Sequence, residues 1–291
     1  MSLVSGVLAA LPTPARSDGS LDLSIFGRLV DFVMDNGVEG ICVGGATGEY
    51  PHFETADRIA VIRRASEALS GKGSLVVGIG APTMPRVVEL GRAAHEAGAR
   101  AVLLPMPMFF RYEQDDLRAY CSQVSRSLGA PCLLYDLPEF TNGLSSETVL
   151  ALLRDEPFIV GIKDSSGRAA NLAAFESAPG RPEWTLIVGD DRLLRQGVAV
   201  GWNGGISGVA ACYPELIVAL VRAERDGRAE DAARLQSRLD EIIAHLTPLP
   251  TPWGIRVALS ARGIDTGPLP LPLTAERRRQ IEAVKAVFSN L

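Results

Sequence analysis

Short apolar segments that are nearly free of charge alternate with segments of helical periodicity from the start of the chain to about residue 225. Eight apolar segments can be counted, at residues 6–11, 40–43, 75–79, 101–104, 132–135, 158–162, 186–188 and 203–206. Continuous apolar runs, unlike alternating apolar and polar positions, are typical of parallel strands that are covered on both faces. We therefore predict eight parallel strands.

The segments between these runs have the spacing of amphipathic helices. Ile25, Leu29 and Val33, for example, fall four positions apart on one helical face. Three helices are predicted to begin at N-caps with a side-chain hydroxyl, namely Thr55, Ser146 and Thr274. A strand and a helix repeated eight times, roughly 25 to 30 residues apart, predict an α/β fold of the closed (β/α)8 type, a TIM barrel.

A doubly wound open sheet is the main alternative for such an alternating pattern. That fold carries a GxGxxG loop after its first strand, whereas Gly78-Ile79-Gly80 is followed by Thr83 at the position of the third glycine. The sequence contains no GxxxxGKS/T phosphate loop either. These observations favour the closed barrel.

Helical periodicity continues beyond the eighth predicted strand, at about 213–246, 252–262 and 274–290. Prolines interrupt it, namely Pro248, Pro250, Pro252 and those of the stretch 268–272. We predict a barrel over residues 1–225 and a C-terminal helical extension over residues 226–291, which packs on the barrel as part of one structural unit.

The composition of the 291-residue chain excludes several classes of partner. A net charge of −5 gives no basic surface for nucleic acid. No apolar run approaches the roughly 20 residues of a membrane helix, and the mildly apolar start lacks the basic segment of a signal peptide, so we expect a cytoplasmic protein. Four cysteines without a CxxC pair are typical of reduced thiols. The three histidines lie in unrelated segments, so no metal site is predicted.

The active site of an α/β barrel forms at the carboxyl ends of the strands, so the residues after each apolar run are the candidates for chemistry. The second run is followed by Gly44-Gly45-Ala46-Thr47-Gly48-Glu49. Its glycines let backbone N–H groups face a ligand and Thr47 adds a hydroxyl, a combination that suits a carboxylate or a phosphate. A tight strand-to-helix turn without a ligand is the alternative.

Tyr135 ends the fifth run, and Lys163 directly follows the sixth. The other two lysines, Lys72 and Lys285, belong to an expected surface loop and a terminal amphipathic helix. If Lys163 points into the barrel mouth, burial lowers the pKa of its amine, which can then attack a ketone. The alternatives are a core tyrosine with a satisfied hydroxyl and a lysine paired with Asp164 at the rim.

The seventh and eighth runs lead into two further turns, Gly189-Asp190-Asp191 and Gly204-Gly205-Ile206-Ser207-Gly208. Neighbouring aspartates rarely converge on one metal ion without further ligands. Hydrogen bonding to a hydroxylated substrate and a purely structural turn are both compatible with the pattern.

Five motifs in this order, namely GATGE at 45–49, YDLP at 135–138, GIKDSSG at 161–167, VGDD at 188–191 and GGISG at 204–208, resemble the pyruvate-dependent class I aldolase family. That family includes dihydrodipicolinate synthase, N-acetylneuraminate lyase and the 2-keto-3-deoxy sugar acid aldolases and dehydratases. The resemblance covers the chain from Gly6 to about Thr274. It implies a (β/α)8 barrel with three C-terminal helices, a homotetramer or dimer, and chemistry without a metal or an organic cofactor.

The resemblance also implies roles for individual residues. Lys163 is similar to the family's Schiff-base lysine, Tyr135 to its acid/base tyrosine, and Thr47 with the surrounding amides to the site for the pyruvate carboxylate. Gly189 and Ile206 match positions whose backbone lines the pocket. The two positions that contact substrate hydroxyls in the sugar-acid members are occupied by Asp191 and Ser207.

Three predicted substrate-binding positions depart from the pattern of dihydrodipicolinate synthases. Those enzymes carry a hydroxyl residue, a tyrosine that reaches a neighbouring subunit and an arginine where this chain has Ala46, Phe109 and Phe140. In those enzymes a hydroxyl and two phenols form a proton relay, of which this chain keeps only the phenol of Tyr135. Arg111 is the nearby candidate for binding a second substrate anion.

We therefore predict a Schiff-base lyase, an aldolase or a dehydratase, that acts on pyruvate and a 2-keto-3-deoxy or 4-hydroxy-2-keto acid. The alternative within the family is a 4-hydroxy-tetrahydrodipicolinate synthase, which condenses pyruvate with aspartate semialdehyde. Two other classes remain open, a barrel that binds pyruvate without turnover and a phosphate-binding barrel isomerase that does not use Lys163.

Overall fold

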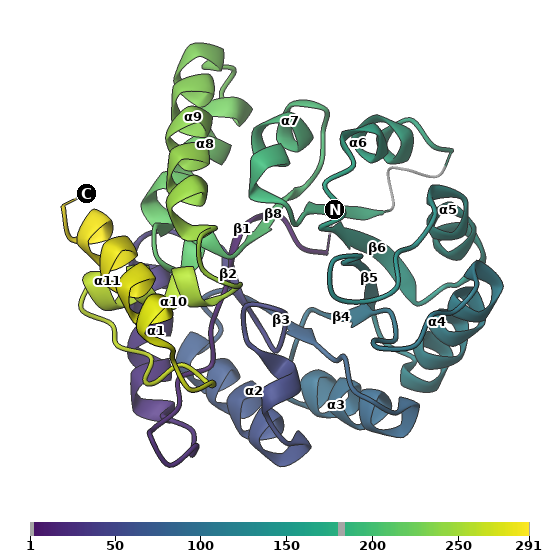
Figure 1. Cartoon of the computed structure of the whole chain (residues 1–291). Helices are drawn as coiled ribbons and strands as arrows, with labels where there is room; N and C mark the ends of the chain where they lie inside the picture. The colour runs from purple at the N-terminus through teal and green to yellow at the C-terminus, as the bar shows by residue number, and fades with distance from the viewer. Residues whose placement is uncertain (1–2, 180–183, 291) are drawn as a thin grey trace.

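The computed structural model of the chain describes residues 3–179 and 184–290. Its strands are parallel, and each pairs with the next until β8 pairs with β1, which closes the barrel seen in Figure 1. The strands are β1 (Gly6–Ala10), β2 (Gly40–Val43), β3 (Ser74–Gly78), β4 (Ala101–Pro105), β5 (Cys132–Asp136), β6 (Ile159–Asp164), β7 (Thr185–Val188) and β8 (Gly204–Ser207). The predicted (β/α)8 barrel is thus confirmed.

The observed strands differ from the predicted runs by one or two residues at their ends, because polar residues at the carboxyl ends still take part in strand pairing. β6 continues to Asp164, so Lys163 lies within the strand rather than after it. In the pairing of β5 with β6, Tyr135 is opposite Lys163 and Asp136 is opposite Asp164. Since side chains alternate along a strand, each pair shares one face of the sheet.

Apolar side chains of the strands form two separate clusters. One fills the barrel interior and includes Leu8, Cys42, Leu103 and Tyr135. The larger cluster lies between the strands and the surrounding helices. Tyr135 therefore belongs to the interior face of the barrel, and its opposite partner Lys163 points to the same side.

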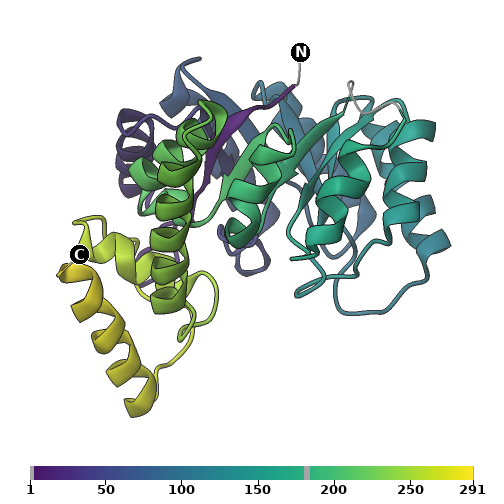
Figure 2. The same cartoon turned by 90° about the horizontal axis from the view of Figure 1, so that it is seen from above.

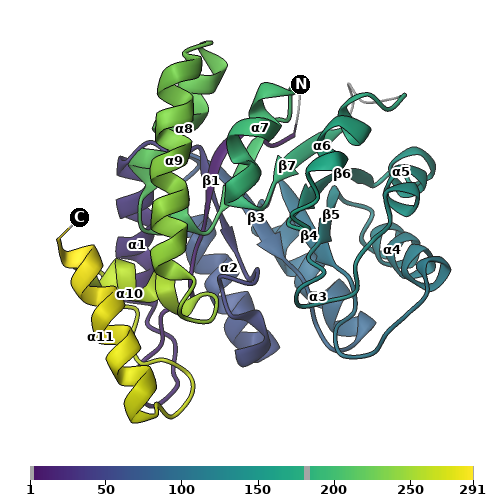
Figure 3. The same ribbon diagram turned by 45° about the horizontal axis from the view of Figure 1, so that its top comes forward.

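Eight helices follow the strands and surround the barrel (Figure 1, Figure 3). They are α1 (Leu23–Asp35), α2 (Thr55–Leu69), α3 (Met84–Glu96), α4 (Gln114–Leu128), α5 (Ser146–Asp155), α6 (Ala169–Glu176), α7 (Leu194–Ala199) and α8 (Pro214–Arg225). Short 3₁₀ turns lie at Tyr50–His52, Asp191–Leu193 and Val209–Ala211. Within the described ranges, no helix is long and apolar enough to cross a bilayer.

The C-terminal extension consists of α9 (Ala229–Leu246), α10 (Trp253–Ala261) and α11 (Ala275–Ser289). The predicted helix over 213–246 is two helices, α8 and α9, because the chain turns at Gly227 with a positive φ of 73°. Figure 1 shows the three helices gathered on the side of the barrel that carries α1 and α8, and Figure 2 shows α11 projecting away from the barrel.

Two of the three predicted N-caps are wrong by one position. Thr55 is the first residue of α2, after the N-cap Glu54. Ser146 follows the actual N-cap Ser145, whose hydroxyl accepts a backbone hydrogen bond from the first turn. Thr274 caps α11 as predicted. Adjacent polar residues make the exact cap position ambiguous in the sequence.

Candidate active site

A cavity of about 240 Å³ opens at the carboxyl ends of the strands. Both the barrel and the C-terminal extension contribute residues to its wall. Most of the predicted site residues line it, namely Ala46, Thr47, Tyr135, Phe140, Lys163, Gly189, Asp191 and Ile206. The two that do not are Ser207 and Phe109.

The centre of the cavity is a contact between Lys163 and Tyr135. The amine Nζ donates a hydrogen bond to the phenol Oη at 3.2 Å, and it lies 4.3 Å from the ring centroid. Lys163 is 5% exposed and Tyr135 is 2% exposed. The register of β5 against β6 brings the two residues together, although they are 28 positions apart in the sequence.

The pKa of Lys163 results from opposing influences. Burial lowers it, because a desolvated ammonium is disfavoured, but the neighbouring Tyr135, Cys42 and Asp191 raise it, and the net shift is upward. The net direction is therefore opposite to the predicted lowering of this pKa. A protonated amine must release a proton before it can act as a nucleophile, and the Tyr135 hydroxyl is in contact with the Lys163 amine.

Gly189 provides the space for the lysine side chain. A Cβ atom at this position would lie 2.9 Å from the Lys163 Cε atom and 2.1 Å from the Ser165 hydroxyl. Asp164 points to the opposite face of β6, where its carboxylate accepts hydrogen bonds from Asn171 at 2.7 Å and from the Ser166 amide at 2.7 Å. The alternative of a rim pair between Lys163 and Asp164 is thereby excluded.

The loop after β2 turns tightly beside the cavity. Gly44 has a positive φ of 67°, and a Cβ atom there would lie 2.8 Å from the Gly78 carbonyl oxygen. The loop is closed by hydrogen bonds from the Gly48 amide to the Gly45 carbonyl and from the Glu49 amide to the Ala46 carbonyl. Thr47 in the middle of this loop lines the cavity.

Asp191 is an acidic residue of the cavity wall whose pKa is strongly shifted. Burial raises the pKa of its carboxyl to about 6, although hydrogen bonds from Ser207 and from the Val209 amide act in the opposite direction. Ser207 is fully buried and also accepts a hydrogen bond from the Ala210 amide. Ser207 therefore stabilises the Asp191 carboxylate by a hydrogen bond and does not line the cavity.

The two phenylalanines predicted at the site differ in position. Phe140 lines the cavity with a half-exposed ring. Phe109 is 90% exposed, has a positive φ of 74° and contacts the ring of Phe110 at 5.0 Å. Arg111 is exposed and is not a lining residue. A single chain thus leaves Phe109 and Arg111 outside the cavity.

Several lining residues were missed by the sequence analysis. Arg192 and Glu139 add two charged groups to the wall. The C-terminal extension adds an apolar surface made of Ile243, Leu246, Leu249 and Ile255. Arg192 directly follows the predicted VGDD motif, so its position gave a signal, whereas nothing in the sequence indicates which face of a distant helix reaches the cavity.

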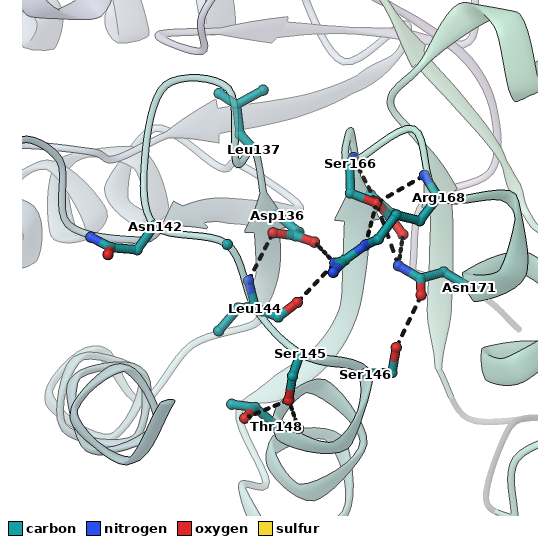
Figure 4. A network of polar contacts seen from close by, with 12 residues as sticks. Asp136, Leu137, Asn142, Leu144, Ser145, Ser146, Thr148, Ser166, Arg168 and Asn171 are labelled. Carbon is teal, nitrogen blue, oxygen red and sulfur yellow. Dashed lines mark hydrogen bonds and ion pairs between the residues drawn. The ribbon is translucent and has the colours of Figure 1, made fainter. Parts of the chain in front are cut away.

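A polar network supports the outer side of the same two strands (Figure 4). The fully buried carboxylate of Asp136 accepts hydrogen bonds from the Leu144 amide at 3.0 Å and from Arg168 at 2.5 Å. Arg168 also donates to the Leu144 carbonyl and to the Ser166 hydroxyl. Burial and the nearby Asp164 raise the pKa of Asp136, while the bonds from Leu144 and Arg168 lower it, with a net upward shift.

Across the described ranges 3–179 and 184–290, no group of three or more histidine, cysteine or acidic residues is placed to hold a metal ion. The described residues of the cavity wall bring several polar groups together. They are a buried amine in contact with a phenol, a loop with a hydroxyl and backbone amides, and a carboxylate with a raised pKa.

Comparison with known proteins gives consistent matches along the chain. The profile of the dihydrodipicolinate synthetase family matches residues 3–291. A DapA-like lyase of Halobacterium salinarum is 33% identical over 98% of this chain and 93% of its own length. A 4-hydroxy-tetrahydrodipicolinate synthase of Methanosphaerula palustris is 30% identical over 99% of both chains. The crystal structure of YagE from Escherichia coli K12, in complex with pyruvate, has a TM-score of 0.91 at 27% identity over 99% of both chains.

Proposed function

The chain belongs to the dihydrodipicolinate synthetase family and is a class I pyruvate-dependent lyase, and we propose that it forms its imine with pyruvate or a 2-keto acid on Lys163. The observation that carries this proposal is the buried contact of 3.2 Å between the Lys163 amine and the Tyr135 hydroxyl in the cavity. An amine at this position has a proton-transfer partner and little competing water.

In the proposed reaction Lys163 attacks the ketone carbon of the substrate, and the carbinolamine loses water to give a protonated imine. The imine accepts the electron pair released when C3 loses a proton or a carbon partner, which gives an enamine. Tyr135 donates a proton to the carbinolamine oxygen and, during cleavage, accepts the proton of the C4 hydroxyl as the C3–C4 bond breaks. In the condensation direction it returns that proton to the C4 oxygen of the partner. The loop with Thr47 holds the carboxylate and so orients C2 toward the amine.

We propose a hydroxylated 2-keto acid, of the 2-keto-3-deoxy or 4-hydroxy type, as the substrate that is cleaved or dehydrated. The wall beyond Lys163 is rich in hydroxyl-binding groups, among them Asp191 and Glu139. Phe140 lines the cavity with an apolar ring at the position where dihydrodipicolinate synthases carry an arginine. This ring offers no positive charge to the carboxylate of a second substrate. Burying such a carboxylate without a cationic partner costs several kcal/mol, about 3 or more.

A 4-hydroxy-tetrahydrodipicolinate synthase is the second candidate function. Relatives that carry this name match almost the whole chain at 30% identity or slightly more. Among the lining residues of the described chain, Arg192 is the cation besides Lys163, and it lies 3.9 Å from Asp190. In this reading Arg192, not Arg111, would bind the carboxylate of aspartate semialdehyde.

Trapping with borohydride in the presence of pyruvate tests the proposed imine. We expect one three-carbon unit to be added at Lys163, as mapped by peptide mass spectrometry. Lys163→Arg should abolish the adduct, because a guanidinium does not deprotonate to a nucleophile. Lys72→Arg is the matched control and should react normally. An adduct at another lysine contradicts the proposed mechanism. The absence of any adduct also contradicts it and favours the isomerase, whereas an adduct without any turnover indicates a binding protein.

A comparison of kcat/KM on the purified protein separates the two substrates. We expect pyruvate release or dehydration with at least one 2-keto-3-deoxy or 4-hydroxy-2-keto acid, and negligible condensation with aspartate semialdehyde. A synthase value near about 10⁴ M⁻¹s⁻¹, which is within the range of working enzymes, would establish the second candidate.

We further propose a cytoplasmic homotetramer or dimer. All four cysteines are buried free thiols, which suits a reducing compartment. The exposed pair of Phe109 and Phe110 supplies an apolar surface for a second copy of the chain.

A further inference from the structure

A buried ion pair joins helix α10 of the C-terminal extension to the loop after β2. The Arg256 Nη1 atom lies 2.8 Å from the Glu49 Oε2 atom, and both side chains are 5% exposed. The two residues are 207 positions apart in the sequence. Neither is a lining residue of the cavity, so the pair contacts no substrate in the proposed reaction.

Arg256 is held from several directions. Its Nε atom donates to the Thr266 hydroxyl at 3.1 Å, and its Nη2 atom donates to the carbonyls of Thr266, Gly267 and Pro268 at 3.2, 3.1 and 2.7 Å. The guanidinium therefore joins three parts of the chain, namely helix α10, the segment 266–268 and the loop after β2. Such a network fixes the position of the arginine before any ligand binds.

Glu49 transmits this position to the loop. It is the last residue of the GATGE motif and has a positive φ of 52°, and its amide donates to the Ala46 carbonyl at 3.0 Å. The preceding Gly48 carbonyl is held by the Thr13 hydroxyl at 2.9 Å. Ala46 and Thr47 line the cavity, so a shift of Glu49 displaces the groups that face the ligand.

Stability alone does not account for this pair. A buried ion pair can often be replaced by apolar residues of similar volume without loss of stability. The pair is also incompletely satisfied, because the buried Oε1 atom of Glu49 accepts no hydrogen bond from the described residues and has the half-exposed His52 Nδ1 at 3.8 Å. The fixed geometry of the loop is the property that the pair supplies.

We propose that Glu49 and Arg256 form a positioning pair, by which the C-terminal extension sets the geometry of the carboxylate-binding loop. This inference rests on the proposed function, in which that loop binds the carboxylate of pyruvate. The neighbouring residues Gly254 and Ile255 of α10 line the cavity directly. The extension is accordingly part of the active site and not only a covering layer.

The test measures the pyruvate concentration that gives half-maximal borohydride trapping on Lys163 in full-length variants. We expect Glu49→Gln and Arg256→Met to raise this concentration about 10- to 100-fold, because a small displacement of binding groups has effects of this size. The trapping rate at saturating pyruvate should change much less, since Lys163 and Tyr135 are untouched. Arg256→Lys should recover part of the affinity, and the double variant should lose little more than the stronger single variant.

Arg262→Met is the matched control. Arg262 also joins the extension to the barrel, through Glu215 and the Cys212 carbonyl, but it does not line the cavity or contact the loop. Its half-saturating pyruvate concentration should equal that of the wild type. Circular dichroism and the melting temperature establish that each variant is folded, and Glu49→Gln, which keeps the side-chain volume, decides the question if Arg256→Met does not fold.

Folded Glu49→Gln with half-saturation within about twofold of the wild type would overturn the positioning role, as would an equal effect of Arg262→Met. A wild-type protein that traps no pyruvate would instead overturn the proposed function. The two failures are therefore distinguishable within one series of measurements.

Discussion

At the scale of single residues, Asp191 shows how the cavity affects both stability and chemistry. Its folded-state pKa of about 6 lies above the ordinary value of 3.8, and burial is the main cause. Between these two pH values the folded protein binds more protons than the unfolded chain, so stability falls as the pH rises through this range. The ionised carboxylate is thus a destabilising group at neutral pH, which agrees with the proposed role of Asp191 in binding substrate hydroxyls rather than in stability.

Asp191→Asn should accordingly stabilise the protein at pH 7.5, by up to about 3 kcal/mol and by less where cavity water screens the charge. The gain should disappear as the pH is lowered to about 4, because the wild-type carboxyl is then protonated. Melting temperatures measured across this pH range test the sign. The same variant should lose turnover of hydroxylated substrates. A gain in stability that persists unchanged at pH 4 would contradict the assignment.

Tyr135→Phe tests the proton transfer. We expect kcat to fall about 10²- to 10⁴-fold, the usual range for loss of a general acid or base, while trapping of pyruvate by borohydride continues slowly. Steady-state kinetics and timed trapping measure the two effects separately. Tyr112→Phe, outside the cavity, is the control and should behave as the wild type. Near-normal turnover in Tyr135→Phe would show that another group is the acid.

Lys163 and Arg256 illustrate what a sequence reveals about single residues. Lys163 was singled out because a charge directly follows an apolar run at a strand end, where barrel enzymes place their chemistry. Arg256 is likewise a charge within an apolar segment, that of α10. A helical segment, unlike a barrel strand, does not indicate which part of the molecule such a side chain contacts. Its partner Glu49 was in a recognised motif, yet only the tertiary fold brings the two together.

At the scale of the elements, two neighbouring strand ends carry the proposed reacting groups on one face and the polar network that supports them on the other. Tyr135 and Lys163 face the cavity, while Asp136 and Asp164 face the helices. Arg168 bonds Asp136, Leu144 and Ser166 and so ties the loops after β5 and β6 to each other. The outer network thereby limits how far the inner pair can separate.

Arg168→Met should destabilise the protein by about 1–3 kcal/mol, since it leaves the fully buried carboxylate of Asp136 without its cationic partner. The partial exposure of Arg168 favours the lower end of this range. The pKa of Asp136 is already raised and should rise further, so the loss should shrink as the pH falls and the carboxyl protonates. Urea unfolding at two pH values measures this. Arg154→Met, an exposed arginine on α5, is the control and should change stability by less than about 0.5 kcal/mol.

The strands were more predictable than the helix boundaries. An uncharged apolar run marks a buried parallel strand because both of its faces are covered, and all eight strands lie at the predicted places. The break between α8 and α9 was missed because the amphipathic spacing continues across Gly227. The N-caps of α2 and α5 shifted by one residue because neighbouring polar residues compete for the cap.

At the scale of the whole molecule, the cavity is built by parts that are distant in the sequence. Barrel residues supply the proposed reacting groups, while α9, α10 and the loop between them supply an apolar wall. Gln236 of α9 also donates a hydrogen bond to the Asp191 carbonyl at 3.1 Å. The extension was predicted as a packed layer, but periodicity alone could not show that it completes the site.

Phe109 combines a strained backbone with an exposed aromatic ring, and the contacts of a single chain explain neither. A bulky residue at positive φ is strained by about 1–3 kcal/mol, and here the strain holds an aromatic ring almost fully in solvent beside the exposed Phe110. Burial of both rings against a second copy would offset this strain, which agrees with the dimer or tetramer that we propose. Phe109→Asp should therefore weaken self-association at least about tenfold, the effect expected for an aromatic contact at the centre of an interface.

Analytical ultracentrifugation over a range of concentrations measures this weakening. Leu271→Asp is the matched control, since Leu271 is an exposed apolar residue of the C-terminal extension that lies far along the chain from Phe109, and its replacement should leave the association unchanged. A wild-type chain that sediments as a monomer at all concentrations, or a Phe109→Asp variant that associates normally, would show that the strained ring serves another purpose. In that case the exposure of Phe109 within the β4–α4 loop would have to be explained within one chain.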